Sequence, residues 1–173
     1  LKKTDDNMKV LDLMTGSGVI AITLAKETKA SIFASDVSNQ ALEIARKNAK
    51  KHKVKIKFIN SDVFKGFKRE KFDMIVSNPP YIPSKEIGNL DEEVRYDPLI
   101  ALDGGEDGLY FYREIANNAH LFLKPKGILV LEIGYNQGEA VKKLLQKNFE
   151  YIKIRKDYNQ NDRIITVKLK DKI

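Results

Sequence analysis

The sequence of 173 residues contains no cysteine and no tryptophan, and its only histidines are His52 and His120. Without cysteine the chain cannot form a disulfide, use a thiol nucleophile or hold zinc or an iron–sulfur cluster on thiolates. Two histidines this far apart do not make a typical histidine-based metal site, so we expect no metal. No apolar run approaches the roughly 18 residues that a membrane-spanning helix requires. We therefore expect a protein of a reducing compartment, the cytoplasm, that does not enter a membrane.

The chain has an excess of positive charge. Lysine and arginine together number 31, against 24 aspartates and glutamates, and the formal net charge is +7. Basic proteins often contact nucleic acid, although lysine-rich surfaces also serve only to keep proteins soluble. Residues 85–107 have the opposite sign, with eight acidic residues against Lys85 and Arg95. The length and the hydrophobic content of 42% predict one globular domain with a full core.

Short apolar runs alternate with segments of helical period along the chain. Strands that alternate with helices form right-handed βαβ units and a mostly parallel sheet. The last two strands have no helix between them and should pair antiparallel. Ligands of such sheets bind beyond the carboxyl ends of the strands. We predict strands at residues 10–13, 32–35, 56–60, 72–77, 127–133, 151–155 and 164–169, and helices at 19–25, from the N-cap Ser38 onward, over 109–123 and around 140–145.

An acidic residue lies at or just beyond the end of each of the first three predicted strands. Asp12 precedes a glycine-rich turn that begins at Gly16, where the backbone can approach a ligand closely. Asp36 ends the second strand, twenty residues after Gly16, where a carboxylate can accept both hydroxyls of a ribose. Asp62 and Val63 follow the third strand and suit an adenine, because the carboxylate accepts from the amino group and the apolar side chain covers a ring face. These positions predict a nucleotide-type cofactor.

The glycine turn also matches the dinucleotide fingerprint G-x-G-x-x-A over residues 16–21. The glycines alone therefore do not separate a nicotinamide dinucleotide from S-adenosylmethionine. A dinucleotide would place its pyrophosphate at this turn, where Asp12 repels it, whereas the sulfonium and ammonium groups of S-adenosylmethionine are cationic. We predict S-adenosylmethionine as the cofactor and S-adenosylhomocysteine as its product.

The fourth predicted strand ends in Asn78-Pro79-Pro80-Tyr81. The two prolines stiffen the backbone and remove two N–H donors, which leaves carbonyls free to accept. The Asn78 side chain and the Pro79 carbonyl can hold both hydrogens of an NH₂ group, and Tyr81 offers a flat face for stacking on a planar group. These four residues are the predicted catalytic element.

This combination indicates methylation of a planar amine or amide nitrogen. The lone pair of such a nitrogen is delocalised, and two acceptors on its hydrogens return electron density to it. Catalysis then consists of in-line positioning and electrostatics. The residues alone leave four functions open. Two are methylation of an amide and methylation of an exocyclic amino group of adenine or cytosine in DNA or RNA. The others are a nicotinamide-dependent oxidoreductase, which would leave the tetrapeptide unused, and a nucleotide-binding module without catalytic activity.

The sequence resembles the class I S-adenosylmethionine-dependent methyltransferases of the Asn-Pro-Pro-Tyr group. More narrowly it resembles the peptide-chain release factor glutamine methyltransferases (the HemK/PrmC family), from about residue 8 to the end. The narrower resemblance lies in stretches beyond the tetrapeptide. These are Ile82-Pro83, Glu93-Val94-Arg95, Asp97-Pro98, Ala101-Leu102, Gly104-Gly105, Asp107-Gly108-Leu109, Leu131-Glu132-Ile133-Gly134, Gln137-Gly138-Glu139-Ala140 and Asn161-Asp162-Arg163.

The resemblance implies a Rossmann-like class I methyltransferase fold, an α/β architecture with about seven strands in the order 3-2-1-4-5-7-6, the last strand antiparallel and helices on both faces. It implies methylation of the side-chain amide of the glutamine in the Gly-Gly-Gln motif of peptide chain release factors, with that glutamine held by Asn78 to Tyr81. Together with the predictions above, the expected cofactor contacts are Asp12, Met14, Thr15, Gly16, Ser17, Gly18, Asp36, Val37, Asp62, Val63 and Asn78.

The chain departs from the family pattern at two points. Met14 stands where the family often has glycine or another small residue. The N-terminal helical domain of the family has no counterpart before the first predicted strand, so we expect residues 1–173 to be a single catalytic domain that engages release factor weakly. We also expect a monomer that acts on a release factor rather than on nucleic acid, because acidic residues follow the tetrapeptide and nucleic-acid enzymes line their approach with basic ones.

Overall fold

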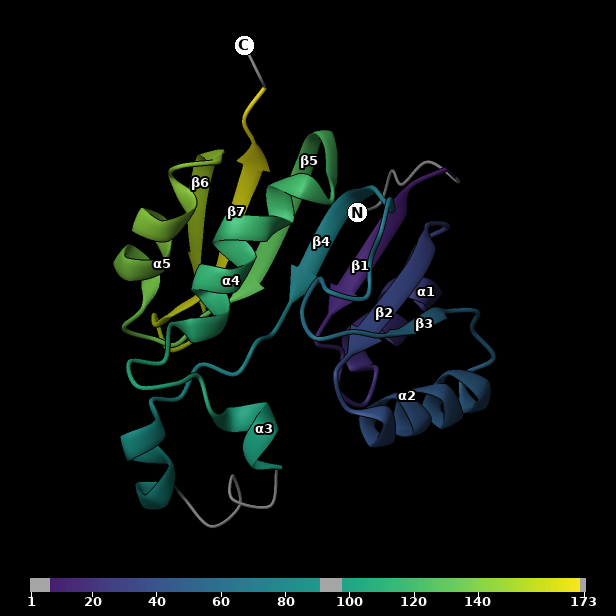
Figure 1. The fold of residues 1–173 in the computed structure, drawn as a ribbon, viewed down its shortest axis with the longest axis horizontal. Coiled ribbons are helices and arrows are strands. Elements are labelled where there is room, and N and C mark those ends of the chain that lie inside the picture. Colours follow the sequence, from purple (N-terminus) through teal and green to yellow (C-terminus); the bar gives the residue numbers. More distant parts are fainter. Residues whose placement is uncertain (1–6, 91–97, 172–173) are drawn as a thin grey trace.

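The computed structural model describes residues 7–90 and 98–171, which form a seven-stranded sheet flanked by helices (Figure 1). The strand order is β3-β2-β1-β4-β5-β7-β6, as the family resemblance implied. Neighbouring strands from β3 to β5 run parallel, and β7 is antiparallel to both β5 and β6. The strands are β1 (Lys9–Leu13), β2 (Ser31–Asp36), β3 (Lys57–Asn60), β4 (Phe72–Ser77), β5 (Leu123–Glu132), β6 (Phe149–Lys156) and β7 (Asp162–Leu169).

Helices cover both faces of the sheet, and Figure 1 shows α4 and α5 in front of it and α1 behind it. The predicted N-cap of α2 is confirmed, because the Ser38 hydroxyl accepts from the Ala41 N–H at 3.2 Å. Within the described ranges, no helix has the length and apolar character needed to cross a membrane. The helices are α1 (Val19–Glu27), α2 (Asn39–Lys51), the 3₁₀ turn η1 (Ser84–Asn89), α3 (Leu99–Leu102), α4 (Tyr110–Asn118), the 3₁₀ turn η3 (Ala119–Leu121) and α5 (Gly138–Leu145).

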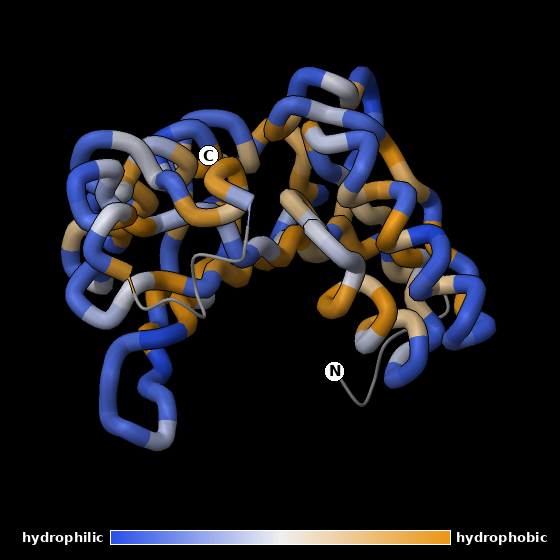
Figure 2. Tube along the Cα trace, turned by 90° about the horizontal axis from the view of Figure 1, so that it is seen from below, coloured by the Kyte–Doolittle hydropathy of each residue, from blue (hydrophilic) through white to orange (hydrophobic). Residues whose placement is uncertain are grey.

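The central strands are buried on both faces because helices cover both, and alternate side chains of each strand enter the two resulting cores. Leu11 and Leu13 of β1 belong to one cluster with Tyr112 of α4 and Val141 of α5. Val10, from the same strand, points to the opposite face and packs with residues of α1. Figure 2 shows the result: hydrophobic segments run through the middle of the molecule and hydrophilic ones lie outside.

The order of the strands reverses between β1 and β4, and open sheets of this type bind ligands at such a switch point. The last residues of the two strands, Leu13 and Ser77, are partners in the parallel register. The Ser77 hydroxyl donates to the Leu13 carbonyl at 2.6 Å, in a buried bond that ties the two strand ends together. The segments that follow Leu13 and Ser77 therefore leave the sheet next to each other.

The helix predicted over 109–123 is shorter than expected. It ends as α4 at Asn118, whose side-chain amide donates to the Glu114 carbonyl at 2.8 Å and so competes with the helix backbone. The following strand, β5, begins at Leu123 and not at residue 127 as predicted. Leu123 pairs with Phe72 of β4, and the register then shifts before Ile128 pairs with Met74. Pro125 and Gly127, which indicate a strand boundary in the sequence, therefore lie inside β5, in its irregular part.

Replacing Leu129 by alanine should lower the free energy of unfolding by about 2–5 kcal/mol, because this side chain of β5 is fully buried in the core. Leu121→Ala is the matched control. The Leu121 side chain is 51% exposed, and its removal should change the free energy of unfolding by no more than about 0.5 kcal/mol. Urea denaturation of the two variants and the parent protein measures both differences. Equal losses in the two variants would contradict the packing described above.

Candidate active site

The turn after β1 includes three residues with left-handed backbone. Met14, Gly16 and Gly18 have φ values of +59°, +54° and +86°, which favour glycine. At Gly18 a Cβ would lie 3.1 Å from the Ala45 Cβ of α2, so the close packing of the turn on that helix requires glycine. Met14, the departure from the family pattern, adopts a backbone that glycine adopts more easily, and its side chain packs against the core.

Asp12 is fully buried beneath this turn. Its Oδ2 accepts from the Ala21 N–H at 2.9 Å and from the Thr15 hydroxyl. Its Oδ1 is also buried, and no group among the described residues bonds it. The pKa of Asp12 is raised to about 6, chiefly by burial and against the lowering effect of the two hydrogen bonds. A buried carboxylate oxygen without a partner is costly, so this position favours a cationic ligand.

Asp36 braces the same turn from the end of β2. Its Oδ2 accepts from the Gly16 N–H and its Oδ1 from the Ser38 N–H, both at 2.9 Å. Each carboxylate oxygen has further acceptor capacity, so the group can still receive the hydroxyls of a ribose. Val37, the next residue, is 46% exposed and presents an apolar surface beside the carboxylate.

The segment after β3 is joined to the end of β2 by the Ser61 N–H, which donates to the Asp36 carbonyl at 2.9 Å. Val63 is buried and has a φ of +46°. The carboxylate of Asp62 forms an exposed ion pair with Lys65, with 2.6 Å between Nζ and Oδ2. Asp62 must therefore exchange this partner, or share it, in order to accept from an adenine amino group.

The tetrapeptide leaves the sheet beside the glycine turn, because it follows the bonded pair of Ser77 and Leu13. The Asn78 side chain is exposed, whereas Pro79 and Pro80 are buried. The carboxyl ends of β1, β2, β3 and β4 thus bring the residues predicted for the cofactor and those predicted for catalysis to one edge of the sheet.

Tyr81 is half-buried and contacted at both ends. Its hydroxyl lies 3.5 Å from Oε1 of Glu132 and 3.4 Å from the Arg163 guanidinium. Burial, and then the Glu132 carboxylate, raise the pKa of Tyr81, so its phenol is neutral at physiological pH. Its main-chain carbonyl accepts from the side-chain amide of Gln137 at 2.9 Å. A neutral ring with fixed ends is suited to stacking on a planar group.

Three residues around Tyr81 were not predicted as part of the site: Glu132, Gln137 and Arg163. They belong to the stretches that carry the family resemblance, which was the one sequence signal that could have found them. Gln137 also bonds the carbonyl of Gly108, in another of these stretches, at 3.2 Å. Some of the predicted features lie outside the described residues, namely Asp91, Glu92, Glu93, Val94, Arg95 and Asp97.

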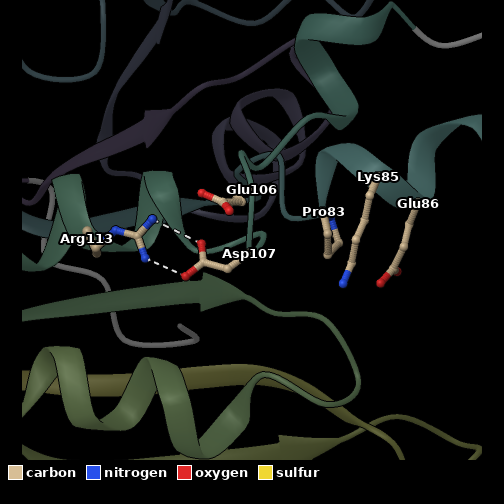
Figure 3. A pocket seen from close by; sticks show the side chains of 6 residues that line it. All are labelled: Pro83, Lys85, Glu86, Glu106, Asp107 and Arg113. Atoms are coloured by element: carbon tan, nitrogen blue, oxygen red, sulfur yellow. Dashed lines mark hydrogen bonds and ion pairs between the residues drawn. The ribbon is translucent and has the colours of Figure 1, made fainter.

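A cavity of about 610 Å³ adjoins the segment that follows the tetrapeptide. Asp107 and Arg113 form a two-bond ion pair in its wall, at 2.8 and 3.0 Å, which lowers the pKa of Asp107 to about 2. The lining carries more acidic than basic groups. In the described part of the chain, no three histidine, aspartate or glutamate side chains gather in a way that could hold a metal ion. Figure 3 shows the lining residues, which are Pro83, Lys85, Glu86, Glu106, Asp107 and Arg113.

Known proteins with similar sequences are methyltransferases. The chain is 45% identical over 168 residues to a bifunctional methyltransferase of Rickettsia felis, a match that covers 94% of this chain and 32% of that protein. It is 43% identical over 167 residues to the release factor glutamine methyltransferase of Bacillus subtilis, with 93% of this chain and 58% of that protein covered. The chain therefore spans only part of the length of these curated relatives.

A solved structure has the same fold at lower sequence identity. It is a 16S rRNA methyltransferase of Thermus thermophilus in complex with AdoMet and guanosine, with a TM-score of 0.69 and 19% identity over 94% of this chain and 38% of that chain. A family model described as "Methyltransferase small domain" matches residues 1–93, more than half of the sequence. With the fold, the strand-end residues and this match in agreement, the chain belongs to the methyltransferase small domain family.

Proposed function

We propose that residues 1–173 form one S-adenosylmethionine-dependent methyltransferase domain that methylates the side-chain amide of the glutamine in the Gly-Gly-Gln motif of peptide chain release factors. The observation that carries the proposal is the pairing of Leu13 with Ser77, which sets the glycine turn and the tetrapeptide side by side. The similarity to the release factor glutamine methyltransferase of Bacillus subtilis supports the choice of acceptor. In this proposal the enzyme works as a monomer in the cytoplasm, with release factors as its partners in translation termination.

The residues at the strand ends fit S-adenosylmethionine. The buried Oδ1 of Asp12, which no group among the described residues bonds, favours the sulfonium and ammonium groups and disfavours a pyrophosphate. When bound, S-adenosylmethionine supplies a methyl group on a positively charged sulfur. Asp36 accepts from the ribose hydroxyls, and Val63 contacts the adenine ring. The residues proposed to hold the cofactor are Asp12, Met14, Thr15, Gly16, Ser17, Gly18, Asp36, Val37, Asp62, Val63 and Asn78.

The tetrapeptide supplies what an amide nitrogen needs in order to accept a methyl group. The exposed side-chain carbonyl of Asn78 and the main-chain carbonyl of Pro79 accept the two amide hydrogens. These bonds return electron density to the nitrogen and fix the direction of its lone pair, so the reaction is promoted by positioning and electrostatics. The ring of Tyr81 stacks on the amide plane. Once methylated, the nitrogen carries an extra proton, which passes to water, so no strong base on the protein is needed.

The distribution of charge favours a protein acceptor over a nucleobase. The same tetrapeptide could hold a flipped adenine or cytosine, and the rRNA enzyme of Thermus thermophilus has the same fold. However, the cavity beside Pro83 is lined by three acidic and two basic side chains, and so offers a phosphate backbone no excess of positive charge. Seven basic residues cluster instead at 46–57, from the second half of α2 through the connection to the start of β3. Most of this stretch lies at the end of the sheet opposite the site. An enzyme that acts on nucleic acid is expected to place such residues around its acceptor site.

Transfer of label from S-adenosylmethionine to three acceptors tests the proposal. The acceptors are a release factor, the same factor with the glutamine of its Gly-Gly-Gln motif replaced by alanine, and RNA. We expect label in the unaltered release factor only. Label in RNA but not in the release factor would overturn the proposal in favour of nucleobase methylation, and equal label in both release factor proteins would exclude the motif glutamine as the acceptor.

Replacing Asn78 by alanine removes one of the two proposed acceptors for the amide hydrogens. We expect kcat to fall by roughly 10²–10³-fold, the usual effect of losing one preorganised hydrogen-bonding group. The affinity for S-adenosylmethionine, measured by calorimetry, should remain largely unchanged. Asn117→Ala, at an exposed position on α4, is the matched control and should keep the parent turnover. If N78A turns over as fast as this control, Asn78 has no catalytic role.

Binding of S-adenosylmethionine should weaken below pH 6, because the raised pKa of Asp12 means that the free protein then carries this carboxyl in its neutral form. At pH 5 about a tenth of the group is ionised, so the affinity should fall roughly tenfold relative to pH 7.5. Asp12→Asn lacks the charge, so it should bind S-adenosylmethionine weakly at both pH values and lose most of this dependence. The turn should stay intact in this variant, because the Thr15 and Ala21 donors can still bond the asparagine oxygen. Calorimetric titrations at the two pH values decide the matter, and parallel profiles for D12N and the parent would exclude Asp12 as the titrating group.

A further inference from the structure

We propose that Gln137 is a positioning residue, whose buried side-chain amide fixes the Tyr81 carbonyl, and with it the acceptor tetrapeptide, against the segment 104–108. The side-chain hydrogen bonds of Gln137 go to Gly134, Tyr81 and Gly108, not to a predicted cofactor residue or a proposed amide acceptor, so it acts through Tyr81. The kinetic part of this inference rests on the proposed methyltransferase function. The structural part, a clamp that closes two chain segments, does not.

The Gln137 side chain is 8% exposed, and its amide bonds three main-chain groups. Nε2 donates to the Tyr81 carbonyl at 2.9 Å and to the Gly108 carbonyl at 3.2 Å. Oε1 accepts from the Gly134 N–H at 2.9 Å. Both N–H bonds of the amide are therefore used, and its oxygen is used as well. A glutamine with this set of partners holds a single orientation.

The position of Gln137 itself is set by the turn from β5 to α5. Its N–H donates to the Gly134 carbonyl at 3.0 Å, and its own carbonyl accepts from the Val141 N–H at 2.9 Å in the first turn of α5. A Cβ on Gly134 would lie 2.7 Å from the Gln137 Oε1, so the turn has room for the amide only because residue 134 is glycine. The clamp is thus anchored in the turn between β5 and α5, outside the segments that it holds.

The two segments that Gln137 joins run side by side. The Ile82 N–H donates to the Leu102 carbonyl at 3.1 Å, the Gly104 N–H to the Ile82 carbonyl at 2.8 Å, and the Ser84 N–H to the Gly105 carbonyl at 2.9 Å. These bonds hold the residues that follow Tyr81 against residues 102–105. Gln137 adds one bond to each segment: to the Tyr81 carbonyl just before the paired residues of the first, and to the Gly108 carbonyl just after those of the second.

Glycine is required where the second segment meets Tyr81. A Cβ on Gly104 would lie 2.8 Å from the Tyr81 Cα, and a Cβ on Gly108 would overlap the Tyr81 carbonyl oxygen and come within 2.8 Å of the Gln137 Nε2. By contrast, the Tyr81 hydroxyl contacts Glu132 and Arg163 only at the long distances of 3.5 and 3.4 Å. The main-chain bond from Gln137, at 2.9 Å, is shorter than either of these contacts, and it adds to the bonds of Ile82 and Ser84 in fixing the segment that begins at Tyr81.

The test uses two substitutions at position 137 and a matched control on α5. Gln137→Met keeps the length of the side chain and removes the amide, and Gln137→Glu sets a carboxylate oxygen against two carbonyl oxygens. Gln146→Met and Gln146→Glu make the same changes at the exposed end of α5. We expect both Gln137 variants to lose roughly 10- to 100-fold in kcat, the effect of a small misplacement of reacting groups. The dissociation constant for S-adenosylmethionine should stay at the parent value, and the Gln146 variants should match the parent throughout.

Hydrogen exchange of the Ile82, Ser84 and Gly104 amides provides a readout that needs neither acceptor nor cofactor. In Q137M these amides should exchange about five- to tenfold faster, as expected for losing a hydrogen bond of about 1 kcal/mol, while amides in β1 keep their protection. Parent-like kcat or parent-like exchange in Q137M would overturn the inference, as would equal loss of protection throughout the sheet. If the parent protein does not methylate release factor, the proposed function fails, and the exchange measurement still decides whether the clamp exists.

Discussion

The bond between the Ser77 hydroxyl and the Leu13 carbonyl joins the two strands on which the candidate site depends. These residues are 64 positions apart in the sequence, and they meet because the strand order reverses between β1 and β4. Parallel neighbours present their carboxyl ends at the same edge, so the glycine turn and the tetrapeptide start from paired residues. Methyl transfer requires the methyl donor and the acceptor nitrogen to lie within reach of each other. The roles proposed for the glycine turn and for the tetrapeptide both depend on this adjacency.

Asp12 is a buried carboxyl group at this edge of the sheet, and its burial costs the protein stability. Burial disfavours its ionised form, and only Oδ2 receives compensating hydrogen bonds, from Ala21 and Thr15. A buried carboxylate with one unbonded oxygen destabilises the folded chain relative to an amide or apolar residue that fits the same space. Such a residue is understandable if its charge serves a ligand. The same negative charge attracts a sulfonium or ammonium group and repels a pyrophosphate, so it separates two cofactors that the glycine pattern cannot.

The strand ends were predictable from the sequence, because apolar runs mark the strands and a parallel sheet gathers their carboxyl ends. This reasoning correctly located Asp36 and Asn78 at one edge. It did not locate Gln137, because the partners of that side chain are main-chain carbonyls 56 and 29 residues away, and a carbonyl is common to every residue type. The end of α4 was missed for a related reason. The helical period of the sequence continues past Asn118, so it predicts a longer helix. The bond from the Asn118 amide to the Glu114 carbonyl, which accompanies the helix end, depends on local geometry that the period does not contain.

The two prolines leave the tetrapeptide rich in acceptors and poor in donors. That composition suits the carbonyls of Asn78 and Pro79, which are proposed to take the amide hydrogens, but any other free carbonyl nearby would compete for the same hydrogens. Gln137 brings a donor from outside the tetrapeptide to the Tyr81 carbonyl, which leaves that carbonyl with less capacity to compete. The Gly108 carbonyl is satisfied by the same amide. An acceptor site of this kind is therefore defined as much by the carbonyls that the protein satisfies internally as by those it presents to the substrate.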